Sequence, residues 1–288
     1  MNLSSTNPQK KNPMTSEVRH GLLLVKKPSG ITSHDLVDQA RRVLHTKAVG
    51  HCGTLDPMAS GLMVLLVGEA TKLSNYVLEE DKGYKLRAKL GVVTDTLDTT
   101  GTILSEVKVD GVRLHEKARG GGVVETPMRK MNFFEFKNFS QGPDWIEFEM
   151  GCTKGSYVRA WVHEFGQKLG CGAAMSALER TVSEPYRIKD AHTLDEVAKA
   201  LSESRIEDYL VPMTEALPSY KRLRVSGLDE TLFGNGQISH ALKSQLISIF
   251  RPDLDEGVKI LSRSTGKLMG LVGLEPGKGF SIRRVFKY

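Results

Sequence analysis

The side chains best suited to chemistry lie in one glycine-rich stretch, Val49–Gly61 (VGHCGTLDPMASG), which contains Asp56. Three glycines and a proline interrupt helical and strand periodicity, so the stretch predicts a loop. Glycines let the backbone approach a ligand closely, and a loop held between regular elements often carries reactive groups. Asp56 could supply a carboxylate nucleophile or a counter-charge. It could equally form an Asx turn or cap a helix that begins at Pro57.

Regular elements on both sides must hold this loop. Upstream, Leu22–Val25 is a short apolar run that predicts a strand, and turn residues follow it. Thr32 is a good N-cap with Asp35 as its capping-box partner, and apolar residues then recur with helical spacing to about His45. Downstream, Gly61–Gly68 predicts a buried strand. The loop is therefore expected between a helix and a core strand.

A strand with one basic face is predicted further along. Apolar and basic residues alternate there with the period of two that is typical of a strand: Tyr84, Leu86, Ala88 and Leu90 on one side, Lys85, Arg87 and Lys89 on the other. Tyr84 could contribute a phenol to a site or could pack in the core with its apolar neighbours. The basic face could contact phosphate groups or could be a solvated surface.

A helix is predicted to begin near Arg159. Apolar residues recur with helical spacing from Val158 to Leu169, and Gly170 is a typical residue at a helix end. Arg159 could pair with a carboxylate in a site, or it could be a surface residue at the helix start. Tyr157 would point to the same side as Arg159 if the chain were extended there.

Composition excludes several classes of protein. The chain has 288 residues, of which 40% are hydrophobic and 26% charged, so we expect a packed core rather than disorder. Its three cysteines form no C-x-x-C pair and its eight histidines have no metal-binding spacing, so we expect neither a disulfide framework nor a metal site. No apolar stretch approaches the roughly 18 residues of a membrane span, and the polar N-terminus lacks a secretory signal. A cytoplasmic, reducing compartment fits these features.

The excess of positive charge lies at the end of the chain. The formal net charge is +6, and residues 219–288 hold 12 Lys and Arg against 6 Asp and Glu. We predict a flexible tail over residues 1–20, a mixed α+β domain over 21–217 and a small β-barrel module over 218–288, where glycines separate short strand-like pieces. A basic module indicates a polyanion partner, most often nucleic acid, or simply a basic surface.

Four blocks of the sequence resemble the TruB-type tRNA pseudouridine synthases. In the family's order they are GLLLVKKPSGITSHD, VGHCGTLDPMASGLMVLLVGEATKL, DKGYKLRAKLGVVTDTLDTTG and CTKGSYVRAWVHEFGQKLGCGA. The segment GHCGTLDPMASG is highly specific for this family. Residues 218–288 resemble, more weakly, the PUA-type RNA-binding domain that ends many bacterial members. The resemblance implies an α+β fold with an antiparallel-rich sheet flanked by helices, followed by a small β-barrel.

The resemblance also implies an activity. Members of the family isomerise one uridine in the T-loop of tRNA, at tRNA position 55, to pseudouridine. The bond from C1′ to N1 breaks, the uracil turns and a C1′–C5 bond forms, without cofactor, metal or energy source. The reaction needs an ionised carboxylate in a dry pocket and a base taken out of its stack. We therefore expect a monomer that binds tRNA at the T-arm, with the C-terminal module at the acceptor end.

Three residues match the family's catalytic machinery by their places in the motifs. Asp56 matches the catalytic aspartate, and Arg159 matches the arginine that pairs with it and keeps it ionised. Tyr84 matches the aromatic residue that lies against the flipped base and that, in mechanistic proposals, takes a proton from the sugar.

Further residues match the family's substrate contacts. Tyr157 matches a pocket residue, and His51 matches a residue beside the displaced nucleotide, although a histidine in a loop is more often simply hydrogen-bonded. Leu178 matches an apolar pocket residue, or is core. Lys26 and Lys27 are candidate phosphate contacts.

The chain departs from the family pattern between Gly101 and Gly111. Nine residues stand there in place of a longer segment that includes a helix. The longer segment is associated with an element that closes over the RNA, and such a lid often completes a site. We therefore expect weaker or slower action on tRNA than in full-length relatives. The alternatives are a non-catalytic tRNA-folding chaperone and a synthase that acts on another stem-loop RNA.

Overall fold

The structure is a computed structural model that describes residues 19–78, 80–106 and 132–288. Residues 1–18, which carry most of the predicted tail, lie outside the described residues, as does the part of the shortened segment beyond Glu106. Arg19 and His20, placed in the tail by the sequence, contact the body of the protein. The His20 Nδ1 atom accepts a hydrogen bond from the Glu69 amide at 2.9 Å, and Arg19 pairs with Glu207.

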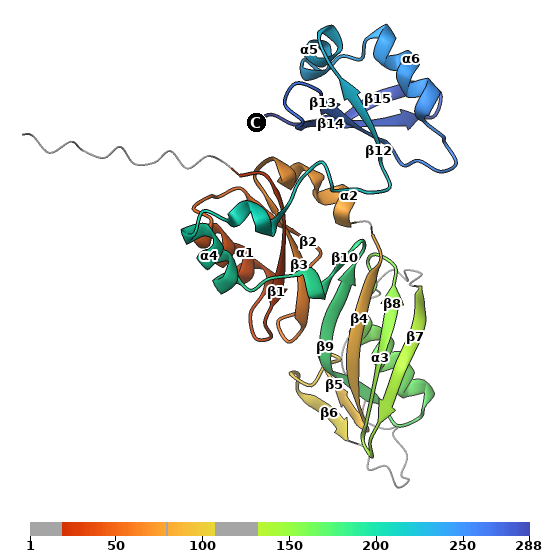
Figure 1. Ribbon diagram of the computed structural model, residues 1–288. Helices are drawn as coiled ribbons and strands as arrows, with labels where there is room; N and C mark the ends of the chain where they lie inside the picture. Colours follow the sequence, from red (N-terminus) through yellow and green to blue (C-terminus); the bar gives the residue numbers. More distant parts are fainter. Residues whose placement is uncertain (1–18, 79, 107–131) are drawn as a thin grey trace, which may run out of the picture.

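A nine-stranded sheet forms the body of the protein, which we define as residues 19–217 (Figure 1). Its main path runs β11-β1-β3-β9-β4-β8-β7, with β2 paired to β3 and β10 paired to β9. Every pairing in it is antiparallel except β3 with β9, which confirms the predicted antiparallel-rich α+β fold. The strands are β1 (Gly21–Lys27), β2 (Val49–Cys52), β3 (Ser60–Val67), β4 (Lys82–Leu90), β7 (Phe133–Gln141), β8 (Trp145–Cys152), β9 (Ala173–Ser183), β10 (Tyr186–Arg187) and β11 (Leu210–Val211). A separate hairpin pairs β5 (Val92–Thr94) with β6 (Ile103–Glu106).

The helices of the body cover both faces of this sheet. One face packs against α1 (Ser33–Val43), α3 (Val158–Lys168) and α4 (Leu194–Ser202), whose apolar residues share one core with the strands. The other face packs against the 3₁₀ helix Gly68–Leu73 and α2 (Ser74–Leu78). Shorter 3₁₀ turns lie at Ile188–Asp190 and Ile206–Tyr209. In Figure 1, α1 and α4 lie beside β1–β3, whereas α3 lies behind β4 and β8.

The two halves of the sheet meet at a narrow seam between β3 and β9. Two parallel residue pairs join them, Ser60 with Glu179 and Gly61 with Arg180. Gly61 has φ +110°, and a Cβ atom at this position would clash with the backbone of Arg180. A glycine is therefore required for the close approach of the two strands.

The predicted N-terminus of the first helix is confirmed in detail. Thr32 is the N-cap of α1, and its Oγ1 atom accepts a hydrogen bond from the Asp35 amide at 3.0 Å. The Thr32 amide in turn donates to the Asp35 carboxylate at 2.8 Å, which completes a capping box. This cap sets the point at which the chain enters α1, immediately beside the glycine-rich loop.

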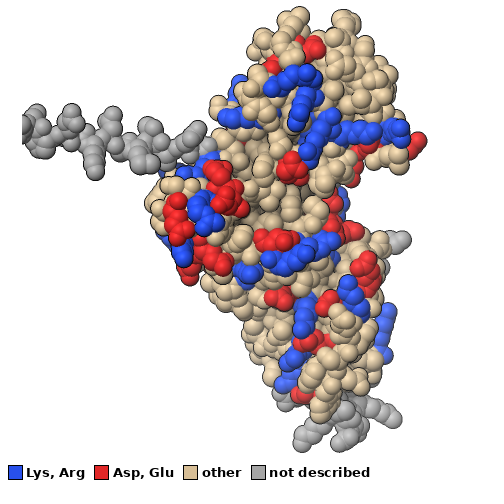
Figure 2. Space-filling model, in the orientation of Figure 1, with Lys and Arg blue, Asp and Glu red and all other residues tan. Residues whose placement is uncertain are grey.

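The C-terminal module, residues 218–288, holds four strands and two helices. Where the sequence predicts a small barrel, the structure has one mixed sheet in the order β12-β13-β14-β15, with β12 parallel to β13. Its elements are β12 (Lys221–Val225), α5 (Leu228–Gly234), α6 (His240–Ile249), β13 (Val258–Ser262), β14 (Leu268–Glu275) and β15 (Gly279–Val285). Figure 2 shows basic side chains gathered on this module, whereas basic and acidic side chains are mixed over the body.

The module and the body share a hydrophobic core. Leu22 and Leu24 of β1 belong to the same buried cluster as Leu268 and Phe286 of the module. The Lys287 amide donates a hydrogen bond to the Glu69 carboxylate of the body at 2.8 Å. Since the two parts bury each other's apolar side chains, removal of the module would expose the core of the body to water.

Candidate active site

The glycine-rich loop is held to the turn that precedes α1. Ser33, the first residue of α1, accepts a hydrogen bond from the Leu55 amide at 2.9 Å and donates one to the Leu55 carbonyl at 3.0 Å. The Gly30 amide donates to the Pro57 carbonyl at 2.8 Å. Asp56 therefore lies between two anchored neighbours, on a loop that the start of α1 holds in place.

The carboxylate of Asp56 pairs with Arg159, as the sequence predicted. The Arg159 Nη1 atom lies 3.3 Å from the Asp56 Oδ2 atom, and about a third of each side chain is exposed (34% and 32%). The side chain of Asp56 thus faces a cation rather than serving as a helix cap. Because the carboxylate is still partly open to solvent, a substrate must cover it before the site becomes dry.

The predicted helix start near Arg159 is confirmed, so Tyr157 and Arg159 do not share one face of an extended chain. Tyr157 is the N-cap of α3, with extended backbone angles, but Arg159 already lies in the first turn of the helix. The two side chains still meet, since the guanidinium carbon of Arg159 lies 6.0 Å from the centre of the Tyr157 ring. The helix start, and not strand alternation, brings the ring of Tyr157 and the guanidinium of Arg159 together. Tyr157 is 58% exposed at the mouth of the site.

Tyr84 lies on the buried face of β4, opposite Arg180 of β9. Burial raises the pKa of the Tyr84 hydroxyl, while the charge of Arg180 and a hydrogen bond from it act in the opposite direction. Leu178 is also buried and pairs with Leu86, in the core cluster that contains Tyr84. The phenol is thus held in an apolar wall with one cationic partner.

A second acidic residue, Asp98, lies in the polar loop after β5. It is 4% exposed and accepts hydrogen bonds from the Thr100 amide at 2.9 Å and from the Thr96 hydroxyl at 2.9 Å. Burial raises the pKa of Asp98, but the hydrogen bonds from Thr100 and Thr96 and the charge of Arg159 outweigh it, so the pKa is lowered. The Arg159 guanidinium therefore interacts electrostatically with both Asp56 and Asp98.

His51 lies on β2, half-buried, with its backbone opposite Leu65. Its ring meets that of His34 edge to face, with 5.6 Å between the ring centres. Burial lowers the pKa of His51, and the charges of His34 and Arg180 lower it further. Both effects favour the neutral form of the imidazole.

The two neighbouring lysines of β1 point in opposite directions. Lys26 is exposed, whereas Lys27 is 1% exposed and lies beneath the loop. The Lys27 Nζ atom donates hydrogen bonds to the carbonyls of Asp56 at 3.3 Å, Pro57 at 3.3 Å and Ala59 at 2.6 Å. Sequence reasoning took Lys27 for a phosphate contact, which is wrong, because its ammonium group is buried among backbone carbonyls.

Strand parity could not have separated Lys27 from Lys26. Leu23 and Val25, on the face of Lys27, are buried, but Leu22 and Leu24, on the face of Lys26, are buried as well. The alternation of side chains along β1 therefore does not show which of the two lysines turns inward.

The basic face of β4 is engaged with acidic neighbours. Lys85 lies 3.0 Å from one oxygen of the Glu147 carboxylate, and Arg87 lies 3.0 Å from the other. Arg87 also lies over the Trp145 ring at 4.4 Å from its centre. These contacts favour the interpretation of this face as a solvated, ion-paired surface.

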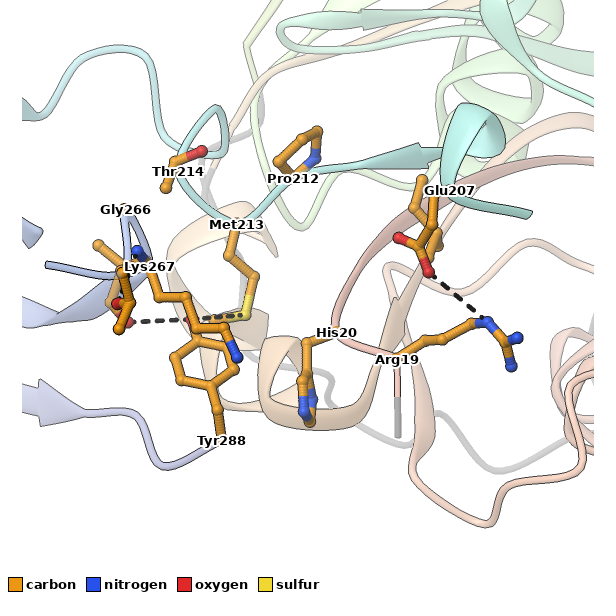
Figure 3. Close-up of a pocket in the computed structure, with 12 residues that line it drawn as sticks. Arg19, His20, Glu207, Pro212, Met213, Thr214, Gly266, Lys267 and Tyr288 are labelled. Atoms are coloured by element: carbon orange, nitrogen blue, oxygen red, sulfur yellow. Dashed lines mark hydrogen bonds and ion pairs between the residues drawn. The ribbon is translucent and has the colours of Figure 1, made fainter. Parts of the chain in front are cut away.

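A pocket of about 630 Å³ lies elsewhere, between the body and the C-terminal module (Figure 3). Tyr288, Lys267 and His20 line it, with the Lys267 ammonium 4.9 Å from the centre of the Tyr288 ring. Arg19 and Glu207 pair at 3.6 Å on its other side. None of the residues predicted from the sequence for the site lines this pocket.

Within the part of the chain that the structure describes, a metal-binding cluster and a membrane-spanning helix are both absent. No cluster of three or more His, Cys, Asp or Glu side chains there could hold a metal ion. No helix of residues 19–78, 80–106 and 132–288 combines the length and apolar character needed to cross a bilayer.

Comparison with known proteins identifies the family. Residues 41–106 and 102–158 match the TruB family pseudouridylate synthase (N terminal domain), and residues 159–218 match the tRNA pseudouridylate synthase B C-terminal domain. The first match comes in two pieces that overlap at residues 102–106, where the sequence departs from the family pattern.

Proteins that are similar over most of their length indicate the same family. The chain is 50% identical to tRNA pseudouridine synthase B of Bdellovibrio bacteriovorus, over 93% of this chain and 97% of that one, and 42% identical to that of Opitutus terrae, over 69% and 95%. Its fold is similar to a chain in the structure of an H/ACA RNP bound to a substrate RNA containing 2′-deoxyuridine, with a TM-score of 0.68 at 20% identity over 99% and 92% of the two chains. The chain belongs to the TruB family of pseudouridylate synthases.

Proposed function

We propose that this protein isomerises uridine to pseudouridine at position 55 in the T-loop of tRNA. The observation that carries the proposal is the Asp56–Arg159 ion pair at 3.3 Å, in a chain of this family. Tyr84 lies in the adjacent apolar wall of the sheet. A guanidinium beside a carboxylate orients it and balances its negative charge.

The chemistry balances within the substrate. The C1′–N1 bond breaks and a C1′–C5 bond forms, while a proton leaves C5 and a proton is gained at N1, so no oxidant or reductant is consumed. Asp56 acts either as a nucleophile or as the counter-charge of a cationic sugar intermediate. Tyr84 lies against the uracil, in the apolar wall of the site. Arg159 holds the Asp56 carboxylate in place and aims it at the nucleoside.

The target nucleotide must leave its stack to reach Asp56. His51 stacks in the place that the everted nucleotide vacates, and its neutral ring suits that role. Tyr157 and Leu178 contact the uridine, and Lys26 contacts a phosphate group. The arriving nucleotide displaces water from the exposed third of the Asp56 side chain, which strengthens the electrostatic interactions of the carboxylate.

The proposal extends to the compartment, the oligomeric state and the roles of the two domains. The protein acts as a cytoplasmic monomer without cofactor. Residues 21–217 form the catalytic domain, and residues 218–288 form an RNA-binding module that contacts the acceptor end of tRNA. The net positive charge of that module supports a phosphate-binding role.

The direct test uses unmodified tRNA transcript. After incubation with the protein, carbodiimide treatment and primer extension should give a strong stop at the T-loop uridine. A transcript with cytidine at that position should give none. Equal stops at uridines outside the T-loop would overturn the site assignment, and the absence of every stop would overturn the activity.

The C-terminal module is expected to contribute to the salt dependence of tRNA binding. Arg224 and Arg284 are exposed on β12 and β15. Replacing either by Gln should weaken binding and reduce the slope of log Kd against log salt by about one. Deleting residues 219–288 is a poor test, because it would uncover the core that the module shares with the body.

The matched control is Lys199→Gln on α4, a basic residue that is 77% exposed and outside the module. Its salt slope should equal that of the unmodified protein. If Arg224→Gln and Arg284→Gln also leave the slope unchanged, the module does not contact phosphate groups through these strands.

A further inference from the structure

Arg180 is a buried cation that donates to three backbone carbonyls and to the Met63 sulfur. It lies near the end of β9 and is 1% exposed. Its Nε atom donates to the Leu62 carbonyl at 2.7 Å, Nη2 to the Gly53 carbonyl at 3.1 Å and Nη1 to the Thr54 carbonyl at 3.4 Å. Burial of a charge is costly unless hydrogen bonds satisfy it, so this geometry ties the position of Arg180 closely to these three carbonyls.

The three carbonyls bracket the loop that carries Asp56. Gly53 and Thr54 precede it, and Leu62 follows it on β3. One guanidinium thus holds both ends of the loop, while Lys27 holds the carbonyls of its middle. The backbone pairing of Arg180 with Gly61 fixes the guanidinium to the seam between the two halves of the sheet.

Arg180 also reaches the second residue of the site. It faces Tyr84 across the β4–β9 pairing, and its positive charge acts on the Tyr84 hydroxyl against the effect of burial on the pKa. The same residue therefore holds the loop that presents Asp56 and lies opposite the residue that presents the phenol. Arg159 differs from it, because Arg159 touches the Asp56 carboxylate itself.

We infer that Arg180 is a positioning residue for pseudouridine formation, which holds the Asp56 loop and the Tyr84 hydroxyl in a fixed relation to each other. This inference rests on the proposed function. Arg180 acts through these two groups, since its own guanidinium is closed off from solvent and from the substrate side of the loop. Precise alignment of reacting groups is worth large rate factors, and a displacement of about 1 Å can cost roughly 100-fold.

The kinetic test compares Arg180→Met, Arg180→Lys and Glu179→Gln, a neighbouring residue on the same strand. For Arg180→Met, kcat should fall by about 100-fold, while KM and the Kd for tRNA stay within about threefold. Arg180→Lys should recover about tenfold of the lost kcat, because an ammonium group can still donate to some of the carbonyls. Glu179→Gln should behave as the unmodified protein.

Hydrogen exchange separates positioning from loss of fold. In Arg180→Met, amides of residues 53–62 should lose protection, while those of Leu23–Val25 in the core of β1 keep it. Equal loss at both places, or unchanged kcat in Arg180→Met, would overturn the inference. So would a fall in kcat with full protection of residues 53–62.

The two proposals fail in different ways. If the unmodified protein forms pseudouridine and Arg180→Met does so at the same rate, only the role of Arg180 is lost. If the unmodified protein forms none, the proposed function is lost, and the exchange measurement still decides whether Arg180 holds the loop.

Discussion

Replacing Asp56 by Asn is expected to lower the rate of pseudouridine formation by more than about 10³-fold. The amide keeps the shape of the carboxylate and can still accept a hydrogen bond from Arg159. It carries no charge, however, and can neither attack the nucleoside nor stabilise a cationic sugar. The measurement is a single-turnover assay on T-arm transcript, read by carbodiimide modification and primer extension.

Binding of tRNA and folding of the protein should be nearly unchanged in Asp56→Asn. The Kd for tRNA should remain within about threefold, because phosphate contacts supply most of the affinity. Asp38→Asn, on the exposed face of α1 where Asp38 pairs with Arg41, is the matched control and should retain full activity. A rate close to that of the unmodified protein would remove Asp56 from the mechanism. A cellular role untouched by inactive Asp56→Asn would favour the chaperone function.

Replacing Lys27 by Met is expected to lower the free energy of unfolding by about 2–3 kcal/mol. Methionine keeps the apolar stem, but the carbonyls of Asp56, Pro57 and Ala59 lose their shared donor. The carbonyls of Asp56 and Pro57 keep the amides of Ala59 and Gly30 as donors, but the Ala59 carbonyl loses its 2.6 Å contact. A buried carbonyl that loses its donor is destabilising, and the loop should relax. Chemical denaturation measures the stability, and the pseudouridine assay should show a lower kcat as Asp56 loses its position.

Lys26→Met provides a control one residue away. Lys26 is exposed and its amide, not its side chain, is engaged with His192 in the structure. The free energy of unfolding should therefore change by less than about 0.5 kcal/mol, while tRNA binding weakens if Lys26 contacts phosphate. If Lys27→Met is as stable as Lys26→Met, the carbonyl contacts of Lys27 do not stabilise the fold.

Periodicity predicted the elements that follow one regular pattern. The capping box of Thr32 and the alternation that begins at Tyr84 correspond closely to α1 and β4. β7 could not be found in this way. It has two positive-φ residues, Glu135 and Asn138, and its register shifts on either side of Lys137. Its phenylalanines, at positions 133, 134, 136 and 139, do not follow the period of two that is typical of a strand.

The site was only partly predictable for a related reason. Motif resemblance singled out Asp56 and Arg159, and the structure brings their charged groups to 3.3 Å. The roles of Lys27 and Arg180 were not predicted. A cation that donates to backbone carbonyls has no acidic partner whose spacing along the sequence could reveal it. Such contacts depend on how distant segments of the chain fold together. The periodicity of a single strand does not reveal that arrangement.

The seam between β3 and β9 separates the residues of the candidate site into two groups. Asp56 belongs to the half of the sheet that contains β1 and β3, whereas Tyr84 and Arg159 belong to the half that contains β4 and β9. Neither half contains the charged pair by itself, so the relation of the carboxylate to its guanidinium depends on the two residue pairs that join β3 to β9.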